Sequence, residues 1–285
     1  MSNRNKNDYS PILHEKSAEY YWKGTGALSI KTFSGGRAMY QAGHGHFAVE
    51  EGRYLLLNQG QEYSISIEAD LPVESFCVFF PEGFVPEVGR SLTMPVNTLL
   101  DEPFRTDNGQ IDFVMRTYEI LPELSCVLQQ MRLDSMQQLH DEARLEEQLY
   151  ALASVLIGEH LQVRRDIAEL PSIKASTRQE LYRRLYTGYE YILAYYKQPI
   201  SVSEVAEAAC LSTNHFLRSF KQLFGATPYQ IIKEKRLQEA EWLLRHTDLP
   251  VTEICFEVGF HSQGSFSTSF ARRFGDSPSA YRHEE

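Results

Sequence analysis

Two histidines and a glutamate in the N-terminal half have the spacing of a metal site. His44, His46 and Glu50 follow the order His-x-His, three residues, Glu, and imidazole and carboxylate groups bind zinc, iron or manganese. The histidines stand in a glycine-rich turn, however, and the next histidine is His140. No pair of nucleophile and base stands out in the sequence either. We therefore predict no catalytic residue, no metal and no cofactor, with a metal-dependent enzyme as the alternative.

The last third of the chain contains one stretch of sequence twice. Residues 216–228 match residues 266–278 at six positions, all at an offset of 50. In each copy phenylalanines recur at i and i+4, which places them on one face of a helix. That face is predicted to pack in a core. Polar residues such as Asn214, Arg218 and Lys221 then lie off that face, where a partner has access to them.

Each copy follows a shorter helical pattern, since residues 202–206 align with residues 251–255 at an offset of 49. Two helix starts are predicted, at Ser201 to Glu204 and at Thr227 to Gln230. The predicted helices span 202–209, 213–223, 229–245, 251–258 and 262–273. Lys235 and Arg236, on the joining helix, are predicted to lie on a solvated face or to form local ion pairs. Helix, short turn and helix is the layout of a helix-turn-helix.

These residues resemble the AraC/XylS family of transcription regulators. The resemblance runs through FLRSFKQLFGATP, RLQEAEWLLRHT and VGFHSQGSFSTSFARRFGDSPSAYR. It implies that two recognition helices enter successive major-groove turns of double-stranded promoter DNA. The implied base contacts are Asn214, Leu217, Arg218, Gln263, Ser265 and Thr268. The implied phosphate contacts are Lys221, Arg272 and Arg273.

Arg218 is the strongest candidate for reading a base, because a guanidinium binds guanine O6 and N7 together. The alternative is a phosphate contact or an ion pair. The sequence departs from the family at Thr268, where a long Arg or Gln is common, and at Ala271, where Lys is common. An alternative for the second helix is therefore that it mainly contacts and positions the DNA backbone and does not read bases directly.

The N-terminal half is predicted to be a small β-barrel. Short apolar runs between residues 28 and 81 alternate with turn formers, and residues 81–110 are predicted as short strands and loops. This half resembles the cupin-like barrel that many family members carry. The candidate aromatic walls of an effector pocket are Tyr40, Phe47, Tyr54, Tyr63 and Phe79. Ordinary core packing, or a ligand-free scaffold for dimerisation, is the alternative.

A leucine stripe at Leu145, Leu149, Leu152 and Leu156 predicts a helix over 141–166. The stripe either docks on its own barrel or pairs with a second subunit, and we expect a homodimer. A linker follows over residues 169–177, and Thr177 to Glu180 is predicted to be a capping box that starts the next helix.

The charge of the chain is unevenly distributed. The net charge is −10, yet residues 178–285 hold equal numbers of basic and acidic residues. The polar N-terminus, the short apolar runs and four widely spaced cysteines favour a cytoplasmic protein without a membrane partner. We predict an α+β multidomain protein and, if it is an activator, a contact with RNA polymerase. The expected divisions are a sensor barrel, a helical dimerisation segment, a linker and a DNA-binding domain, over residues 1–115, 116–168, 169–177 and 178–285.

Overall fold

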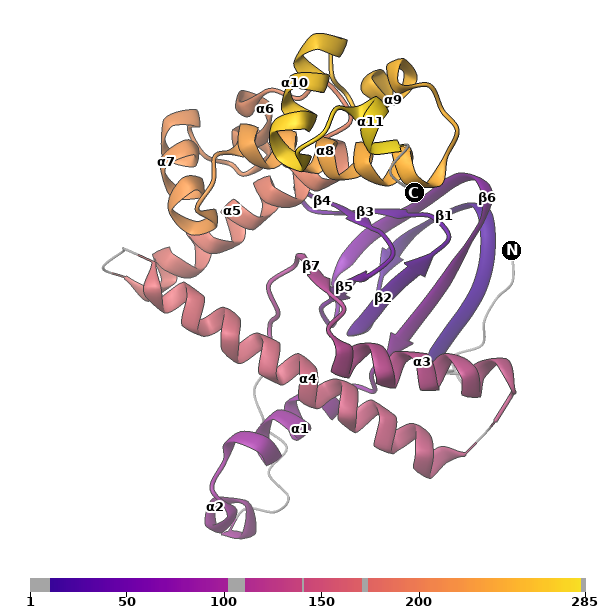
Figure 1. Ribbon diagram of the computed structural model, residues 1–285. Coiled ribbons are helices and arrows are strands. Elements are labelled where there is room, and N and C mark those ends of the chain that lie inside the picture. Colours follow the sequence, from indigo (N-terminus) through magenta and orange to yellow (C-terminus); the bar gives the residue numbers. More distant parts are fainter. Residues whose placement is uncertain (1–10, 102–110, 140, 171–173, 283–285) are drawn as a thin grey trace. The chain divides into compact units, whose positions relative to one another are not determined.

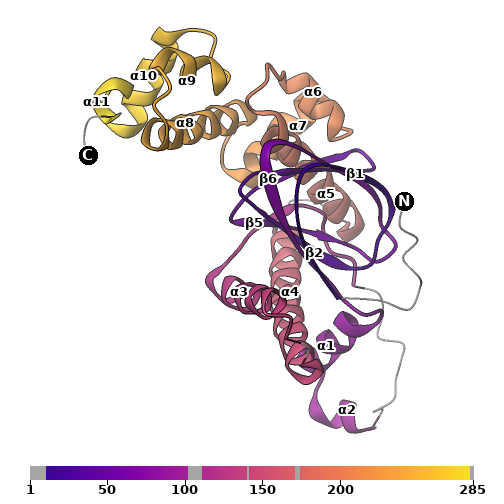
Figure 2. The ribbon, with the colours of Figure 1, turned by 90° about the vertical axis from the view of Figure 1, so that its right-hand side faces the viewer.

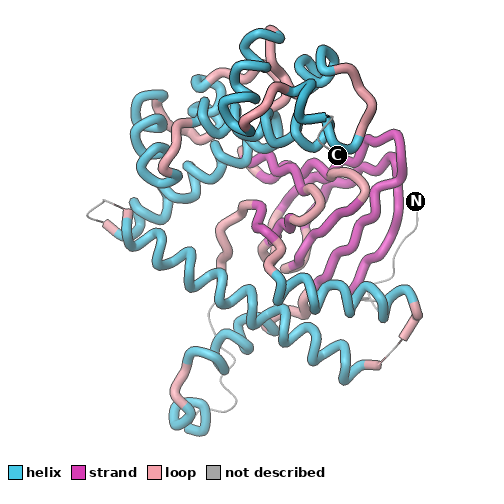
Figure 3. The backbone as a smooth tube through the Cα atoms, viewed as in Figure 1, coloured by secondary structure: helices cyan, strands magenta, loops and turns pink. Residues whose placement is uncertain are grey.

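The computed structural model describes residues 11–101, 111–139, 141–170 and 174–282 (Figure 1). The chain divides into two compact units, residues 1–183 and 184–285. Strands and helices share the first unit, whereas the described part of the second is helical (Figure 3). The α+β, two-domain architecture is therefore confirmed.

Seven antiparallel strands form the nearly closed barrel of the first unit. The long strand β6 (Glu62–Phe79) pairs with β1 (Ile12–Thr25), β2 (Ser29–Ser34) and β3 (Ala38–Ala42). The sheet order is β4-β3-β6-β2-β5-β7, with β1 on β6. The remaining strands are β4 (Gly45–Val49), β5 (Arg53–Leu57) and β7 (Thr117–Glu119).

Residues 81–110 differ from the expectation of short strands and loops. The described part of this segment forms two helices, α1 (Phe84–Thr93) and α2 (Val96–Asp101). Pro86 looks like a helix breaker, but it lies in the first turn of α1, where the helix needs no N–H from it. Val85 and Val88 share the buried face that holds α1 against the unit.

The leucine stripe belongs to α4 (Glu142–Glu169), which packs against α1 and α3 (Pro122–Met136; Figure 2). Leu152 and Leu156 are completely buried within the unit, and Leu149 is nearly so. Of the two alternatives for the stripe, docking on its own domain is therefore the one observed. No helix in the described ranges is long and apolar enough to cross a bilayer.

Asp134 on α3 fastens this helix to α4. Its carboxylate accepts hydrogen bonds from Arg144 Nε at 2.7 Å and from Gln148 at 2.8 Å, and a third from Gln130. Burial alone would raise the pKa of Asp134, but these hydrogen bonds and the charge of Arg144 outweigh it and lower that pKa.

The second unit begins within α5 (Ala175–Tyr195). Helical hydrogen bonding already starts at the carbonyl of Lys174, which accepts the amide of Arg178. Thr177 therefore lies inside the helix, and the start predicted there is wrong. The helices that follow are α6 (Val202–Ala208), α7 (Thr213–Phe224), α8 (Pro228–His246), α9 (Val251–Glu257), α10 (Gln263–Phe274) and α11 (Pro278–Arg282).

The two helix starts predicted at Ser201 and Thr227 are confirmed, and each is a capping box, at the starts of α6 and α8. At α8, Pro228 follows the cap, where its fixed φ suits the first helical position. Within this unit, α8 contacts α7 as well as α9, α10 and α11, so it joins the two helix pairs (Figure 2).

Candidate functional site

The turns between α6 and α7 and between α9 and α10 have the same hydrogen bonds. Cys210 and Gly259 occupy the left-handed region, with φ of 52° and 94°. The amide after each one donates to a carbonyl five residues back, Leu211 to Ala206 and Phe260 to Cys255, at 2.9 and 3.0 Å. This is the Schellman arrangement that ends a helix. The sequence duplication is therefore also a duplication of local backbone structure.

Each turn is bound by an arginine from the helix that precedes its helix pair, α5 for the first pair and α8 for the second. Arg184 on α5 donates to the carbonyl of Cys210 at 2.9 Å, and Arg236 on α8 donates to the carbonyl of Gly259 at 2.6 Å. Arg236 also donates to the carbonyls of Tyr196 and Gln198, at 2.6 and 2.8 Å. The expectation of a solvated or ion-paired Arg236 is wrong, because the guanidinium serves three backbone acceptors. Burial accordingly lowers the pKa of Arg236.

Gly259 leaves no room for a side chain. A Cβ there would lie 2.4 Å from the carbonyl oxygen of Lys197, and φ is in the range that favours glycine. The same connector between α5 and α6 is held from α8 by Glu239, which accepts from Lys197 Nζ at 2.6 Å. The turn before α10 and the connector before α6 are thus fixed to one helix.

Each predicted recognition helix has one buried and one open face. Phe216, Phe220, Phe266 and Phe270 are all completely buried, as their spacing predicts. In the first half, Phe224 stacks on Tyr189 of α5 with ring centroids 4.8 Å apart. These aromatic contacts set the rotation of each helix about its axis, so the opposite face is presented to solvent.

The residues proposed to contact DNA lie on these open faces. Leu217 is half-buried, and the others are exposed: Asn214, Arg218, Lys221, Gln263, Ser265, Thr268, Arg272 and Arg273. Asn214, Arg218 and Lys221 follow a spacing of four and three residues, which aligns them along α7. Arg273 differs from the others, because its Nε binds both carboxylate oxygens of Glu234 on α8, at 2.9 and 3.1 Å.

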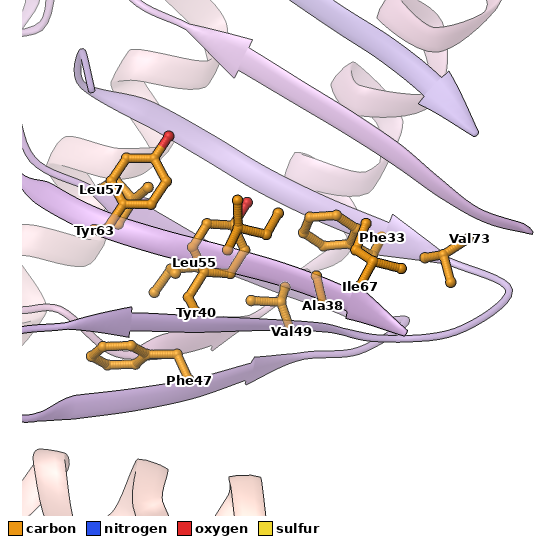
Figure 4. Close-up of a cluster of buried hydrophobic side chains, with 11 residues drawn as sticks. Phe33, Ala38, Tyr40, Phe47, Val49, Leu55, Leu57, Tyr63, Ile67 and Val73 are labelled. Carbon is orange, nitrogen blue, oxygen red and sulfur yellow. The ribbon is translucent and has the colours of Figure 1, made fainter. Parts of the chain in front are cut away.

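The structure brings most of the candidate pocket residues together inside the barrel. Tyr40, Phe47 and Tyr63 belong to one buried cluster (Figure 4), and the rings of Tyr40 and Tyr63 are 5.6 Å apart. Tyr54 does not join them. It alternates with the inward-facing Leu55 and stacks on Tyr118 of β7 at 5.2 Å, so it lies on the other face of the sheet.

Sequence reasoning missed Lys31, a lysine on β2 that is 3% exposed. Its Nζ lies 3.8 Å from the ring centroid of Phe79 and 5.9 Å from that of Tyr63. Burial lowers the pKa of Lys31, and the neighbouring Cys77 opposes this shift. The sequence signal that could have indicated its burial is its position two residues before the apolar Phe33, because residues two apart lie on the same side of a strand.

The metal-like spacing does not build a metal site in the described residues. His44 is exposed in the turn before β4, while His46 is half-buried, and burial lowers the pKa of His46. Throughout the described ranges, no three His, Cys, Asp or Glu side chains gather as metal ligands would. The metal-dependent alternative therefore gains no support.

Known families match both units. Residues 20–153 match the AraC-like ligand binding domain, and residues 205–284 match a helix-turn-helix domain. A protein with this combination is a DNA-binding transcription regulator that also carries a ligand-binding domain. The chain belongs to the AraC family of transcription regulators.

Similar proteins are described as HTH-type transcriptional regulators or activators. The HTH-type transcriptional regulator YdeC of Bacillus subtilis is 23% identical over 98% of this chain and 88% of its own length. The HTH-type transcriptional activator RhaS of Klebsiella pneumoniae is 42% identical, over 30% of each chain. The chain thus spans less than a third of RhaS, although it spans most of YdeC. Both relatives are transcription regulators, and nothing in the comparisons indicates catalytic activity.

Solved structures match about a third of the chain. The DNA-binding domain of AdpA, in complex with a target DNA, is 31% identical and covers 35% of this chain and 89% of that one, with a TM-score of 0.34. The C-terminal domain of AraT from Geobacillus stearothermophilus is also 31% identical, covering 36% and 85%, with a TM-score of 0.35.

Proposed function

We propose that the protein regulates transcription by binding promoter DNA through two helix-turn-helix motifs, α6–α7 and α9–α10. The observation that carries this proposal is the repeated turn geometry, with one polar, solvent-facing helix after each turn. A recognition helix needs this division between a packed face and a face that reaches base edges. α7 and α10 then read successive turns of the major groove, and α8 holds their spacing.

The proposed contacts fall into two classes. Base edges are contacted by Asn214, Leu217, Arg218, Gln263, Ser265 and Thr268. Lys221 and Arg272 contact phosphates, because both are exposed cations near the ends of their helices. Arg273 can contact a phosphate only if its ion pair with Glu234 breaks and the phosphate takes the place of the carboxylate.

Selection from a random pool of duplex DNA with the full-length chain tests the proposal. We expect an enriched sequence with two conserved blocks about 10 base pairs apart, the repeat of one helical turn. Arg218→Ala should weaken binding to that sequence far more than binding to scrambled DNA, whereas Arg272→Ala should weaken both alike. Recovery of no enriched sequence would overturn the proposed function.

The first unit is proposed to sense a small-molecule effector and to form a homodimer. The match to a ligand-binding domain and the aromatic cluster inside the barrel support effector binding. The buried leucine stripe of α4 is not available to a partner, so dimerisation must use other surfaces. Sedimentation of the full chain at micromolar concentration tests this point, and a monomer would contradict it.

The direction of control is proposed by analogy. RhaS is named an activator, and an activator of this kind acts by contacting RNA polymerase. Transcription from a promoter carrying the selected site, with and without the protein, tests this: activation should require the protein, and repression would reverse the assignment.

A further inference from the structure

Lys31 points into the barrel. On β2 it follows the same alternation as Phe33, which belongs to the interior cluster. Its cross-strand partners are Leu55 on β5, also in that cluster, and Cys77 on β6. The lysine therefore lies on the same side of the sheet as the aromatic residues Phe79 and Tyr63, and Figure 4 shows the cluster to which Tyr63 belongs.

The ammonium of Lys31 lacks the partners that a buried charge needs. Within the described residues, no carboxylate and no hydrogen-bond acceptor reaches Nζ, and its contacts are with the faces of Phe79 and Tyr63. Asp134, the other buried charged side chain described in this unit, is bound by three side chains. An unpaired buried charge destabilises a fold, so an anion that entered the interior would stabilise the charged form of Lys31 by pairing with it.

Cys77 does not supply the missing negative charge. Burial raises the pKa of the Cys77 thiol, which keeps it neutral at physiological pH. Aromatic rings also lie near the lysine. Trp22 lies against Tyr63 with ring centroids 4.9 Å apart, and Tyr63 lies against Tyr40. Tyr40 is 3% exposed, and none of the described residues offers its hydroxyl a hydrogen bond.

We propose that the barrel interior binds a small aromatic monocarboxylate, with its carboxylate on the Lys31 ammonium and its ring among Tyr40, Tyr63 and Phe79. One cation and one free hydroxyl suit a single negative charge, whereas a phosphate dianion requires more donors. Aromatic walls suit a flat apolar body. This inference rests on the proposed effector-sensing role, and it assigns the chemical class of the effector.

Matched pairs of acids and amides test the charge directly. Phenylacetate and 3-phenylpropionate are compared with phenylacetamide and 3-phenylpropionamide by calorimetric titration of the full chain. We expect the acids to bind, and Lys31→Met to weaken them by about ten- to a hundredfold, the loss of one charged hydrogen bond. The amides should bind Lys31→Met at least as well as they bind the unchanged protein.

Unliganded stability provides a second measurement. Because Lys31→Met removes an unpaired buried charge and keeps the apolar stem, the melting temperature without ligand should rise. Lys23→Met, at an exposed lysine on β1, is the matched control and should change neither measurement.

Three outcomes would overturn the inference: no acid binds at millimolar concentration, the acids bind equally well to Lys31→Met, or the amides bind the unchanged protein as tightly as the acids. Tighter binding of amides would leave effector sensing intact and reject only the anionic class. The DNA selection described above is independent of all three.

Discussion

Arg236 is predicted to be the main polar support of the second unit. Arg236→Met removes three hydrogen bonds from a guanidinium to the carbonyls of Tyr196, Gln198 and Gly259, all of 2.6 to 2.8 Å. A hydrogen bond to a charged group contributes about 1.5 to 3 kcal/mol. Because the guanidinium is only half-buried, water replaces part of this, and we expect a net loss of about 2 to 4 kcal/mol. For a unit of this size that lowers the melting temperature by roughly 10 to 25 °C.

Calorimetry and hydrogen exchange on the full chain measure this loss. Exchange should accelerate in peptides that cover residues 196–201 and 255–262, the two segments that Arg236 joins. Arg236→Lys keeps the charge but not the planar fork, so it should recover only part of the stability. Arg218→Met is the matched control: Arg218 is exposed, with no hydrogen bond or ion pair in the described structure. This variant should unfold like the unchanged protein and still lose its specific DNA site.

The same contacts predict a defect in DNA binding. Arg236 connects the segment before α6 to the turn before α10, so its loss should loosen the spacing between α7 and α10. Arg236→Met should keep its affinity for DNA that carries only one of the two sequence blocks. It should lose most of the additional affinity that the second block gives the unchanged protein. If Arg236→Met unfolds within about 1 kcal/mol of the unchanged protein, the guanidinium is not a structural support and this reasoning is refuted.

Three further predictions concern other parts of the chain. Gly259→Ala should destabilise the second unit by at least about 2 kcal/mol in denaturant unfolding, whereas Gly264→Ala, with open space around its Cβ, should be neutral or slightly stabilising; equal effects would contradict the role of the tight turn. Lys221→Ala and Arg272→Ala should each reduce the slope of log affinity against log salt by about 1, and an unchanged slope would remove that residue from the phosphate contacts. Because the pKa of Asp134 is lower in the folded state, its ionisation stabilises the protein above the unfolded-state pKa, and that stabilisation is lost as the pH falls through the acid range; Asp134→Asn should flatten the acid limb of a stability-against-pH curve, and an unaltered limb would contradict this.

The helix pairs were predictable from the sequence because their signals are local. Phenylalanines at i and i+4 and the capping boxes lie within a few residues of the structures they specify. β1 was missed for the opposite reason. Residues 12–25 carry many charged and polar side chains, and their strand is defined by pairing with β6, some fifty residues away. Local propensity carries no information about that pairing.

Side-chain roles that depend on distant backbone were not predictable. The acceptors of Arg236 lie 23 to 40 residues away in sequence. Without them, its position on a polar helix face predicted a side chain exposed to solvent. For a related reason the burial of Lys31 was missed and Tyr54 was wrongly assigned to the pocket. Both faces of β2 and most of β5 are buried, and alternation alone does not identify which face is the interior of the barrel.

The zero net charge of residues 178–285 is explained by how their cations are used. Lys197, Arg245 and Arg273 are paired with glutamates on α8, and Arg236 and Arg282 bind backbone carbonyls. These cations support the fold, and three acidic residues neutralise their charge locally. The exposed cations that the described structure leaves without such partners on the proposed recognition helices are Arg218, Lys221 and Arg272. A neutral unit therefore still presents positive charge on the faces of α7 and α10 that are proposed to contact DNA, and on that proposal its affinity depends on a few well-placed contacts and less on a general electrostatic attraction.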